Sequence, residues 1–278
     1  MDLDLCNKVI EVASRRDGTL KEKEMNEINI CIPLAGEGKR FKEANYNEPK
    51  PFILIDGKPM TQLVVENLAF TTFKMKFIFI VQEKHCEEFG FDTKIKEIIR
   101  VAYGQEVAEL TEIIKINQVT EGAACTVLKA RKLIDNNTPL LIANSDQLID
   151  WSIPLFLKAI DDTKADGAIP VFHHTNPKWS YAELNTEGDV IRVKEKEPIS
   201  TYATVGIYYF KQGADYVWAA DEMIHKNLRV NGEFYVCPVF NELIIPKNKK
   251  IISFPIPSYA MHGLGTPEDL EKYVTEYI

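Results

Sequence analysis

Two glycines and two basic side chains stand together after a short apolar run, in the stretch Leu34, Ala35, Gly36, Glu37, Gly38, Lys39 and Arg40. Glycines let a backbone approach a ligand closely, and successive N–H groups in such a turn form a concave site for an anion. Lys39 and Arg40 add the positive charge that a polyphosphate requires. The stretch is not a G-x-G-x-x-G motif, because Phe41 stands at the last glycine position. We predict a triphosphate-binding turn, with a purely structural glycine turn as the alternative.

A second stretch places one lysine between two prolines: Glu48, Pro49, Lys50, Pro51 and Phe52. A proline restricts its own backbone and that of the residue before it. Lys50 therefore loses less entropy when its ammonium group binds an anion. A rigid surface loop is the simpler explanation, but so soon after a basic glycine turn we predict a phosphate contact for Lys50.

An acidic residue follows the apolar run 140–144, where Ser145 and Asp146 mark the end of an expected buried strand. Open α/β sheets bind their ligands at the carboxyl ends of strands. A carboxylate at that place suits a Mg²⁺ ion that bridges phosphates. Helix capping is the alternative for an isolated Asp. We predict that Asp146 is a metal ligand and that Ser145 lies beside the nucleotide.

The order of these motifs resembles a known family. A-G-x-G-x-R-F, then E-P-K-P, then L-I-D-G-K-P is similar to the N-terminal signature of the sugar-phosphate nucleotidyltransferases, also called nucleoside-diphosphate-sugar pyrophosphorylases. The similarity extends through most of 28–278. The resemblance implies that the following residues handle the triphosphate and its metal: Gly36, Gly38, Arg40, Lys50 and Asp146.

A further segment offers groups for a nucleobase. Gln118 carries both a donor and an acceptor for a base edge, and Gly122 leaves room for a flat ring. In the family that the sequence resembles, a similar Q-x-x-x-x-G segment binds the base, which assigns this role to Gln118, Glu121 and Gly122. A helix cap with small packing residues is the alternative.

The second half carries candidate contacts for the acceptor. The sequence V-K-E-K-E-P resembles the family's E-K-P element, which implies that Glu195 holds sugar hydroxyls and Lys196 the sugar phosphate. The extra Glu197 allows this assignment to slip by one residue, and a charged strand end is the simpler interpretation. The same resemblance assigns Gly206 and Glu233 to the acceptor site.

One position departs from the family pattern. Relatives read W-x-D-x-G-T-P near the C-terminus, and that aspartate is often a second metal ligand. This chain reads M-H-G-L-G-T-P, with Gly263 in its place. Either Asp146 and the phosphates hold one Mg²⁺, or His262 or another acid substitutes.

The resemblance implies nucleotidyl transfer, in which a phosphomonoester attacks the α-phosphorus of a nucleoside triphosphate and pyrophosphate leaves. Two polyanions meet in this reaction, so it requires cations rather than a nucleophilic Ser or Cys. The partners are then a nucleoside triphosphate and a small phosphorylated acceptor, by default a sugar 1-phosphate. The ending G-L-G-T-P resembles a bacterial subgroup associated with capsule and surface polysaccharide. We predict that the catalytic residues are Arg40, Lys50, Asp146 and Lys196.

Two other functional classes stay open. A glycosyltransferase that consumes a nucleotide sugar would share the sheet and the metal site, although it would usually show D-x-D where this chain has Ser145, Asp146 and Gln147. A nucleotide-binding protein without activity is the second, because Gly263 removes an expected ligand.

The elements expected to position these groups are short apolar runs that alternate with helical patterns. Such alternation indicates βαβ units and a largely parallel sheet. We therefore predict an α/β fold: a Rossmann-like, mostly parallel sheet flanked by helices, as in the nucleotide-diphospho-sugar transferases, with a smaller mixed β region. The expected strands are 28–33, 77–81, 112–116, 140–144, 168–172, 203–210, 251–256 and a hairpin of 181–184 with 190–194; helical patterns include 62–70, 214–226 and 267–277.

Residues 1–25 are expected to form a short helix and a linker in front of one nucleotidyltransferase domain, 26–278. The nucleotide-binding half of this domain is expected at about 26–150 and the acceptor-binding half at about 151–278.

Composition limits the alternatives. The 278 residues are 45% hydrophobic and 27% charged, which excludes a mostly disordered or collagen-like chain. The net charge of −8 argues against a sequence-independent nucleic-acid partner. No apolar stretch reaches the roughly 18 residues of a membrane helix, and the start lacks a secretory signal. The 5 cysteines are widely spaced, which indicates reduced thiols in the cytoplasm; homo-oligomerisation stays open.

Overall fold

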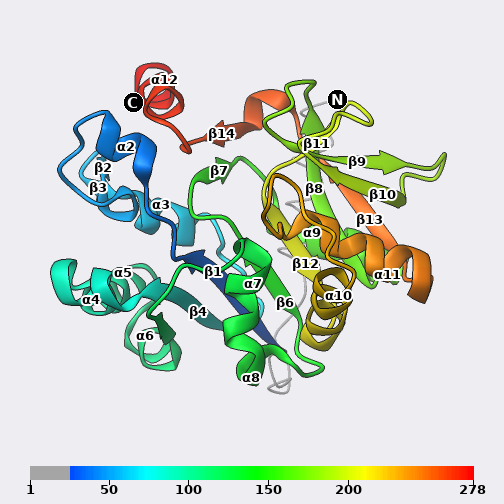
Figure 1. Ribbon diagram of the computed structural model, residues 1–278, viewed down its shortest axis with the longest axis horizontal. Helices are drawn as coiled ribbons and strands as arrows, with labels where there is room; N and C mark the ends of the chain where they lie inside the picture. The colour runs from blue at the N-terminus through cyan, green and yellow to red at the C-terminus, as the bar shows by residue number, and fades with distance from the viewer. Residues whose placement is uncertain (1–25) are drawn as a thin grey trace, which may run out of the picture.

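A computed structural model describes residues 26–278, and the helix and linker expected at 1–25 lie outside this range. Four strands lie parallel in the first half of the chain: β1 (Glu27–Leu34), β4 (Lys74–Gln82), β5 (Glu112–Ile116) and β6 (Leu140–Ala143). They form one end of a 10-stranded sheet in the order β10-β9-β11-β8-β12-β6-β1-β4-β5, with β13 paired to β8 (Figure 1).

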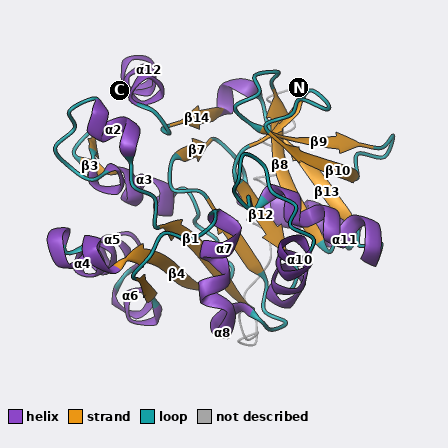
Figure 2. Ribbon diagram, viewed as in Figure 1, coloured by secondary structure: helices purple, strands orange, loops and turns teal. Residues whose placement is uncertain are grey.

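Helices cover both faces of this sheet (Figure 2). Alternate residues of β1 point into two separate clusters, Ile30 and Ile32 into one and Cys31 into the other. Both faces are therefore apolar, and β1 has the nearly continuous hydrophobic sequence of a strand buried on both sides. The first cluster packs against α3 (Met60–Glu66), α5 (Phe91–Tyr103) and α9 (Ile153–Thr163); the second packs against α7 (Ala123–Val127), α8 (Arg131–Ile134), α10 (Gly213–His225) and α11 (Phe240–Lys247).

Antiparallel strands extend the sheet in the second half. The hairpin predicted there is present, and β12 joins the parallel strands by pairing with β6. The predicted α/β fold with a smaller mixed β region is thus confirmed. The strands of this region are β8 (Gly167–His173), β9 (Ser180–Leu184), β10 (Val190–Glu195), β11 (Tyr202–Thr204), β12 (Ile207–Phe210) and β13 (Ile251–Pro255).

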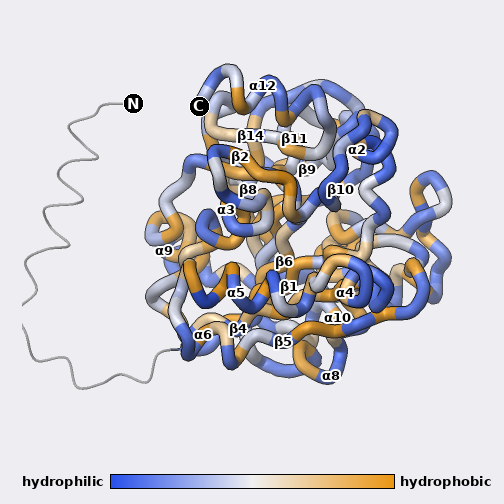
Figure 3. Tube along the Cα trace, turned by 90° about the vertical axis from the view of Figure 1, so that its left-hand side faces the viewer, coloured by the Kyte–Doolittle hydropathy of each residue, from blue (hydrophilic) through white to orange (hydrophobic). Residues whose placement is uncertain are grey.

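The remaining elements complete the chain. They comprise α2 (Lys39–Glu43), η1 (Lys50–Phe52), β2 (Leu54–Ile55), β3 (Lys58–Pro59), α4 (Glu83–Phe89), α6 (Gln105–Leu110), β7 (Gln147–Ile149), β14 (Met261–Gly263) and α12 (Pro267–Tyr277), with single 3₁₀ turns η2 (Leu128–Ala130), η3 (Cys237–Val239) and η4 (Ser258–Ala260). Apolar segments line the interior and polar ones the outside (Figure 3). Within 26–278 no helix has the length and apolar character needed to cross a membrane.

The prediction of one long strand at 203–210 is wrong, because the strand is interrupted at Gly206. This glycine has φ +82°, which few other residues adopt, and a Cβ there would collide with the side-chain amide of Asn144. Its carbonyl accepts the N–H of Asn144 at 2.9 Å. The interruption therefore supports the turn that follows β6.

The helical pattern at 62–70 also extends further than the helix, which ends at Glu66. The reason is a tertiary contact of the next residue. The Asn67 amide donates to the Ile149 carbonyl at 2.9 Å and accepts the Ile149 N–H at 3.0 Å. Asn67 thus serves as a pairing partner for β7 instead of continuing the helix.

We expect Gly206→Ala to lower the free energy of unfolding by about 3 kcal/mol, since it adds both backbone strain and a steric clash. Gly188→Ala is the matched control. Gly188 has φ +87°, but a Cβ there meets nothing within 4 Å, so only the strain, about 1 kcal/mol, applies. Urea denaturation of both variants measures the difference. Equal losses would show that the contact with Asn144 adds nothing.

Candidate active site

One cavity of about 640 Å³ opens at the carboxyl ends of β1 and β6. The glycine turn, the E-P-K-P segment and the turn after β6 all line it, although they are far apart in the sequence. This is the edge at which open α/β sheets bind ligands. The predicted site residues that line the cavity are Leu34, Ala35, Gly36, Glu37, Gly38, Lys39, Arg40, Lys50, Gly122, Ser145, Asp146 and Glu233.

The glycine turn is held open and anchored to the end of β4. Gly38 has φ +62°, and a Cβ there would lie 3.4 Å from the Cβ of Lys50. The buried Gln82 amide donates to the Ala35 carbonyl at 2.7 Å and to the Glu37 carboxylate at 3.1 Å. No residue among 26–278 accepts a hydrogen bond from the N–H groups of residues 36–40. These N–H groups are therefore available to a bound anion, and the concave anion site stays a prediction.

Glu37 is engaged with the protein itself. Lys84 Nζ lies 2.9 Å from its carboxylate and Lys42 Nζ 3.8 Å. The hydrogen bond from Lys84, with that from Gln82, lowers the pKa of Glu37 from 4.5 to about 2. Glu37 therefore stays charged at neutral pH and ties the glycine turn to α4.

Lys50 and Asp146 form an ion pair of 2.6 Å between Nζ and Oδ2. Lys50 begins the η1 turn and Asp146 lies between β6 and β7, 96 residues later. Their side chains are only 17% and 31% exposed, so water screens the attraction less than it would at the surface. The two groups predicted for phosphate and metal thus neutralise each other.

The turn that carries Asp146 is clamped from the C-terminal end of the chain. Leu264 N–H donates to the Asp146 carbonyl at 2.7 Å, and a Cβ at Gly265 would lie 3.2 Å from Asp146 Oδ2. The G-L-G-T-P sequence therefore places a small residue where the carboxylate needs space. A side chain at Gly265 would crowd the group expected to bind the cation.

The donor set fits Mg²⁺ bound with substrate. Mg²⁺ prefers oxygen ligands and commonly takes one or two carboxylates, completing its shell with phosphates and water. Asp146 supplies such a carboxylate in the cavity, with Asn144 and Ser145 beside it. Within 26–278 no three His, Cys, Asp or Glu side chains converge, so the phosphates would provide the remaining ligands.

Gly263 stands where the family pattern has an aspartate, and another acidic residue lies near it. A Cβ at Gly263 would lie 3.8 Å from Cγ of Asp269, which is paired with Lys178 at 3.1 Å. His262 is engaged elsewhere: its Nε2 lies 2.9 Å from Asp150, and its ring packs 4.4 Å from that of Tyr277. The structure thus gives His262 a structural partner.

The segment predicted to bind the base is joined to the segment predicted to bind the acceptor. Phe234 N–H donates to the Glu121 carbonyl at 2.8 Å, and Ala124 N–H donates to the Phe234 carbonyl at 3.0 Å. Gly122 has φ +131°, and a Cβ there would approach Phe234 N to 2.6 Å. Gly122 is therefore required by close backbone packing, and it also lines the cavity.

Two of the residues predicted for the base do not line the cavity. Gln118 is exposed and does not line the cavity, and the Glu121 carboxylate pairs with Arg229. Thr120 and Thr126 line it instead, with their hydroxyl oxygens 2.6 Å apart.

Glu195 and Lys196 lie at the end of β10, outside the cavity lining. Glu195 is 8% exposed, accepts a hydrogen bond from the Ser180 hydroxyl, and has a pKa raised by burial. Lys196 Nζ donates to the Tyr235 hydroxyl at 2.5 Å. Glu197 is exposed and pairs with Lys194, so Glu195 is the glutamate that turns inward.

Sequence reasoning missed several residues that line the cavity, among them Asn144, Thr126, His85, Phe89 and Phe91. The sequence positions of two of these residues could have identified them as site residues. Asn144 directly precedes the predicted Ser145, and His85 follows the end of β4 by three residues, at the same sheet edge. No motif marks the others, because only tertiary packing brings α4 and α5 to the cavity.

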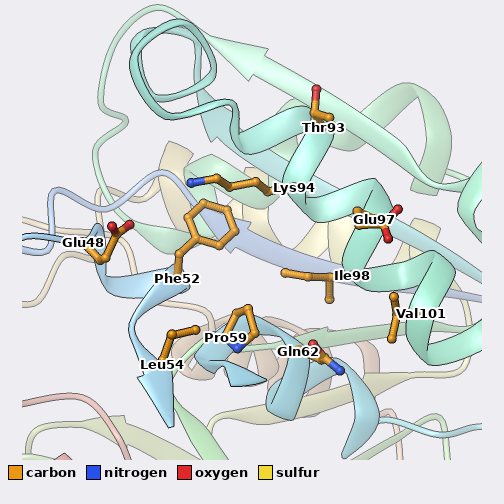
Figure 4. A pocket seen from close by; sticks show the side chains of 10 residues that line it. All are labelled: Glu48, Phe52, Leu54, Pro59, Gln62, Thr93, Lys94, Glu97, Ile98 and Val101. Atoms are coloured by element: carbon orange, nitrogen blue, oxygen red, sulfur yellow. The ribbon is translucent and has the colours of Figure 1, made fainter. Parts of the chain in front are cut away.

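A second cavity, of about 560 Å³, is bordered by Glu48 and Phe52, which flank Lys50 in the sequence (Figure 4). Apolar side chains such as Phe52, Pro59 and Ile98 face into it between η1, α3 and α5. Lys94 Nζ lies 4.9 Å from the centre of the Phe52 ring. Glu48 borders both cavities. This cavity lacks the converging cations of the first, so we place the phosphate chemistry in the first.

Comparison with known proteins identifies the class. The family model described as Nucleotidyl transferase matches residues 32–228, more than half of the chain. The chain belongs to this family. The crystal structure of the nucleoside-diphosphate-sugar pyrophosphorylase from Vibrio cholerae RC9 shares its fold, with a TM-score of 0.74 at 24% identity, covering 89% of this chain and 100% of that chain.

Two curated relatives are similar along most of this sequence. Bifunctional protein GlmU of Methanocaldococcus jannaschii is 27% identical over 262 residues, 91% of this chain and 55% of that protein. UTP--glucose-1-phosphate uridylyltransferase AglF of Haloferax volcanii is 22% identical over 250 residues, 88% of this chain and 94% of that protein. The chain therefore spans about half the length of the GlmU relative and nearly all of AglF.

We expect Glu37→Gln to remove a contribution to stability that depends on pH. The native pKa of Glu37 is about 2 and its ordinary value is 4.5. Its ion pairs therefore stabilise the fold above pH 4.5, and this stabilisation is lost as the pH falls from 4.5 toward 2. The variant is then less stable than the wild type by about 1 kcal/mol at pH 7, and the gap narrows by pH 3.5. Urea denaturation at both pH values measures it, with the exposed Glu27→Gln as control; a gap that is constant with pH would contradict this role.

Proposed function

We propose that the protein is a cytoplasmic, Mg²⁺-dependent nucleotidyltransferase. It transfers a nucleoside monophosphate from a nucleoside triphosphate to a sugar 1-phosphate or a similar small phosphomonoester, and it releases pyrophosphate. One observation carries the proposal: an open anion-binding glycine turn, Lys50 and Asp146 meet in a single cavity at the carboxyl edge of a parallel sheet. Family membership supports the reaction class.

The reaction makes a P–O bond and breaks one. A non-bridging oxygen of the acceptor phosphate attacks the α-phosphorus, the bond to the β-phosphate oxygen breaks, and pyrophosphate leaves with that electron pair. A phosphomonoester has a second pKa of about 6, so it is mostly dianionic at pH 7 and needs no strong base. The protein therefore needs to position and neutralise charge more than to move protons.

Each basic group has a task in this scheme. The glycine turn and Arg40 bind the triphosphate, Lys50 binds a phosphate beside it, and Lys196 binds the acceptor phosphate. Asp146 would hold Mg²⁺, which neutralises phosphate charge when it is bound. Because Lys50 and Asp146 are paired, binding of phosphate and Mg²⁺ replaces their ion pair with one new charge interaction for each group. Lys196 must also leave Tyr235 and turn toward the cavity.

The identity of the acceptor is proposed from a relative, and the role of the product from the C-terminal motif. The name of AglF gives UTP and glucose 1-phosphate as the substrates of that protein, which supports a sugar 1-phosphate here. The G-L-G-T-P ending supports a role in making activated precursors for capsule or surface polysaccharide. Four described cysteines, Cys31, Cys86, Cys125 and Cys237, are free thiols, in keeping with a reducing compartment.

A pyrophosphate-release screen with Mg²⁺ tests the proposal. It crosses CTP, UTP, GTP, ATP and dTTP with a panel of sugar 1-phosphates and small phosphomonoesters. Release with one triphosphate and one acceptor establishes the reaction and both substrates. Release of a nucleoside diphosphate from a nucleotide sugar would instead identify a glycosyltransferase. Triphosphate binding without turnover on any acceptor would indicate a binding protein.

We expect Lys50→Ala and Asp146→Ala each to lower turnover at least about 10²-fold while the fold is kept, because each removes charge at the phosphates. Steady-state kinetics measure the loss, and thermal unfolding verifies the fold. Matched controls are Lys74→Ala, at the far end of β4, and Asp162→Ala, exposed on α9. Near-normal turnover of either active-site variant would contradict its role.

A further inference from the structure

Three aromatic rings form one wall of the cavity. His85 and Phe89 come from α4, and Phe91 begins α5. The centre of the His85 ring lies 5.0 Å from that of Phe91 and 6.3 Å from that of Phe89. Phe91 in turn packs 4.7 Å from Phe52, which ends the turn that carries Lys50. The wall therefore adjoins the phosphate-binding side of the cavity.

His85 is the polar member of this wall, and its polarity is not used within the fold. The side chain is only 6% exposed, and its Nδ1 atom is buried without a hydrogen-bond partner among residues 26–278. Leaving a buried polar atom unpaired costs roughly 1–3 kcal/mol. A phenylalanine would fill the same space between Phe89 and Phe91 without that cost. His85 thus lines the cavity and carries a hydrogen-bonding atom that none of residues 26–278 pairs.

Charged groups of both signs lie around His85, two lysines and two glutamates. Lys84 precedes it on α4, Lys42 reaches the same region from α2, and Glu37 and Glu88 are the acidic groups near it. The Glu37 carboxylate already accepts both lysines. Burial, and then Lys84, lowers the pKa of His85, so the ring is neutral at pH 7 and offers one N–H donor.

The in-line geometry of the displacement indicates which part of the substrate lies next to the His85 N–H group. Asp146, Asn144 and Glu233 border the cavity on the side of the acceptor half, whereas α4 lies on the opposite flank of β1 (Figure 1). The leaving group in an in-line displacement departs on the side opposite to the attacking oxygen. The pyrophosphate therefore extends away from the acceptor half, toward the wall formed by His85, Phe89 and Phe91.

We propose that His85 is a pyrophosphate-binding residue, whose ring N–H donates a hydrogen bond to a terminal phosphate oxygen of the triphosphate and to the pyrophosphate that leaves. This inference rests on the proposed function and adds to it a residue that no sequence motif marks. His85 binds the leaving group and takes no part in proton transfer.

Binding measurements test the proposal without relying on turnover. The probes are inorganic pyrophosphate, the triphosphate that the release screen selects, and the corresponding monophosphate, each titrated by calorimetry with Mg²⁺. We expect His85→Phe to weaken pyrophosphate and triphosphate binding about tenfold and to leave the monophosphate within about twofold. His85→Asn keeps a donor near the position of Nδ1 and should restore most of the affinity. Phe89→Leu, in the same wall but without a polar atom, is the control for packing.

Each outcome has a separate meaning. Equal weakening of monophosphate and triphosphate would show a contact with the base or a structural role, and would overturn the proposal. Unchanged pyrophosphate affinity in His85→Phe would overturn it as well. If His85→Phe does not fold, His85→Asn against His85→Leu makes the same comparison. Wild-type protein that binds neither triphosphate nor pyrophosphate would refute the proposed function itself, whereas normal wild-type binding with insensitive variants refutes only the role of His85.

Discussion

The ion pair between Lys50 and Asp146 is the interaction on which the site depends. It joins two segments 96 residues apart, both of which line the cavity. Each group alone would be a partly buried charge, which is costly to leave uncompensated. As a pair, the two groups neutralise each other and hold both side chains at the place where phosphate and cation are expected.

The arrangement of charges around the cavity also explains how a protein with a negative net charge can bind polyanions. The chain carries a net charge of −8, yet basic groups gather around the glycine turn and η1. Several of these cations have an acidic partner that remains in place, as Lys84 has Glu37. Others, such as Lys39 and Arg40, stay exposed beside the cavity. Local arrangement, rather than total charge, therefore decides what the site attracts.

Glycines act in this molecule mainly by letting segments approach one another. Gly206 admits the side chain of Asn144, Gly122 admits the backbone of Phe234, and Gly265 leaves space at the Asp146 carboxylate. All three contacts hold loops at the carboxyl edge of the sheet against each other. These contacts hold segments of 26–150 against segments of 151–278, and side chains at the three glycine positions would prevent them.

The sequence by itself determined the α/β fold, most of its strands, and the turns of Gly36, Lys50 and Asp146, because these depend on local periodicity and local backbone preference. Tertiary structure decided what distant segments do to each other. The strand predicted at 203–210 is divided at Gly206, and α3 ends before Asn67, whose side chain pairs with β7. Glu37 pairs with Lys84 instead of facing the cavity alone. Tertiary structure also brought His85 to the cavity from α4. These outcomes depend on contacts between residues tens of positions apart, whose energies no local pattern of residue types encodes.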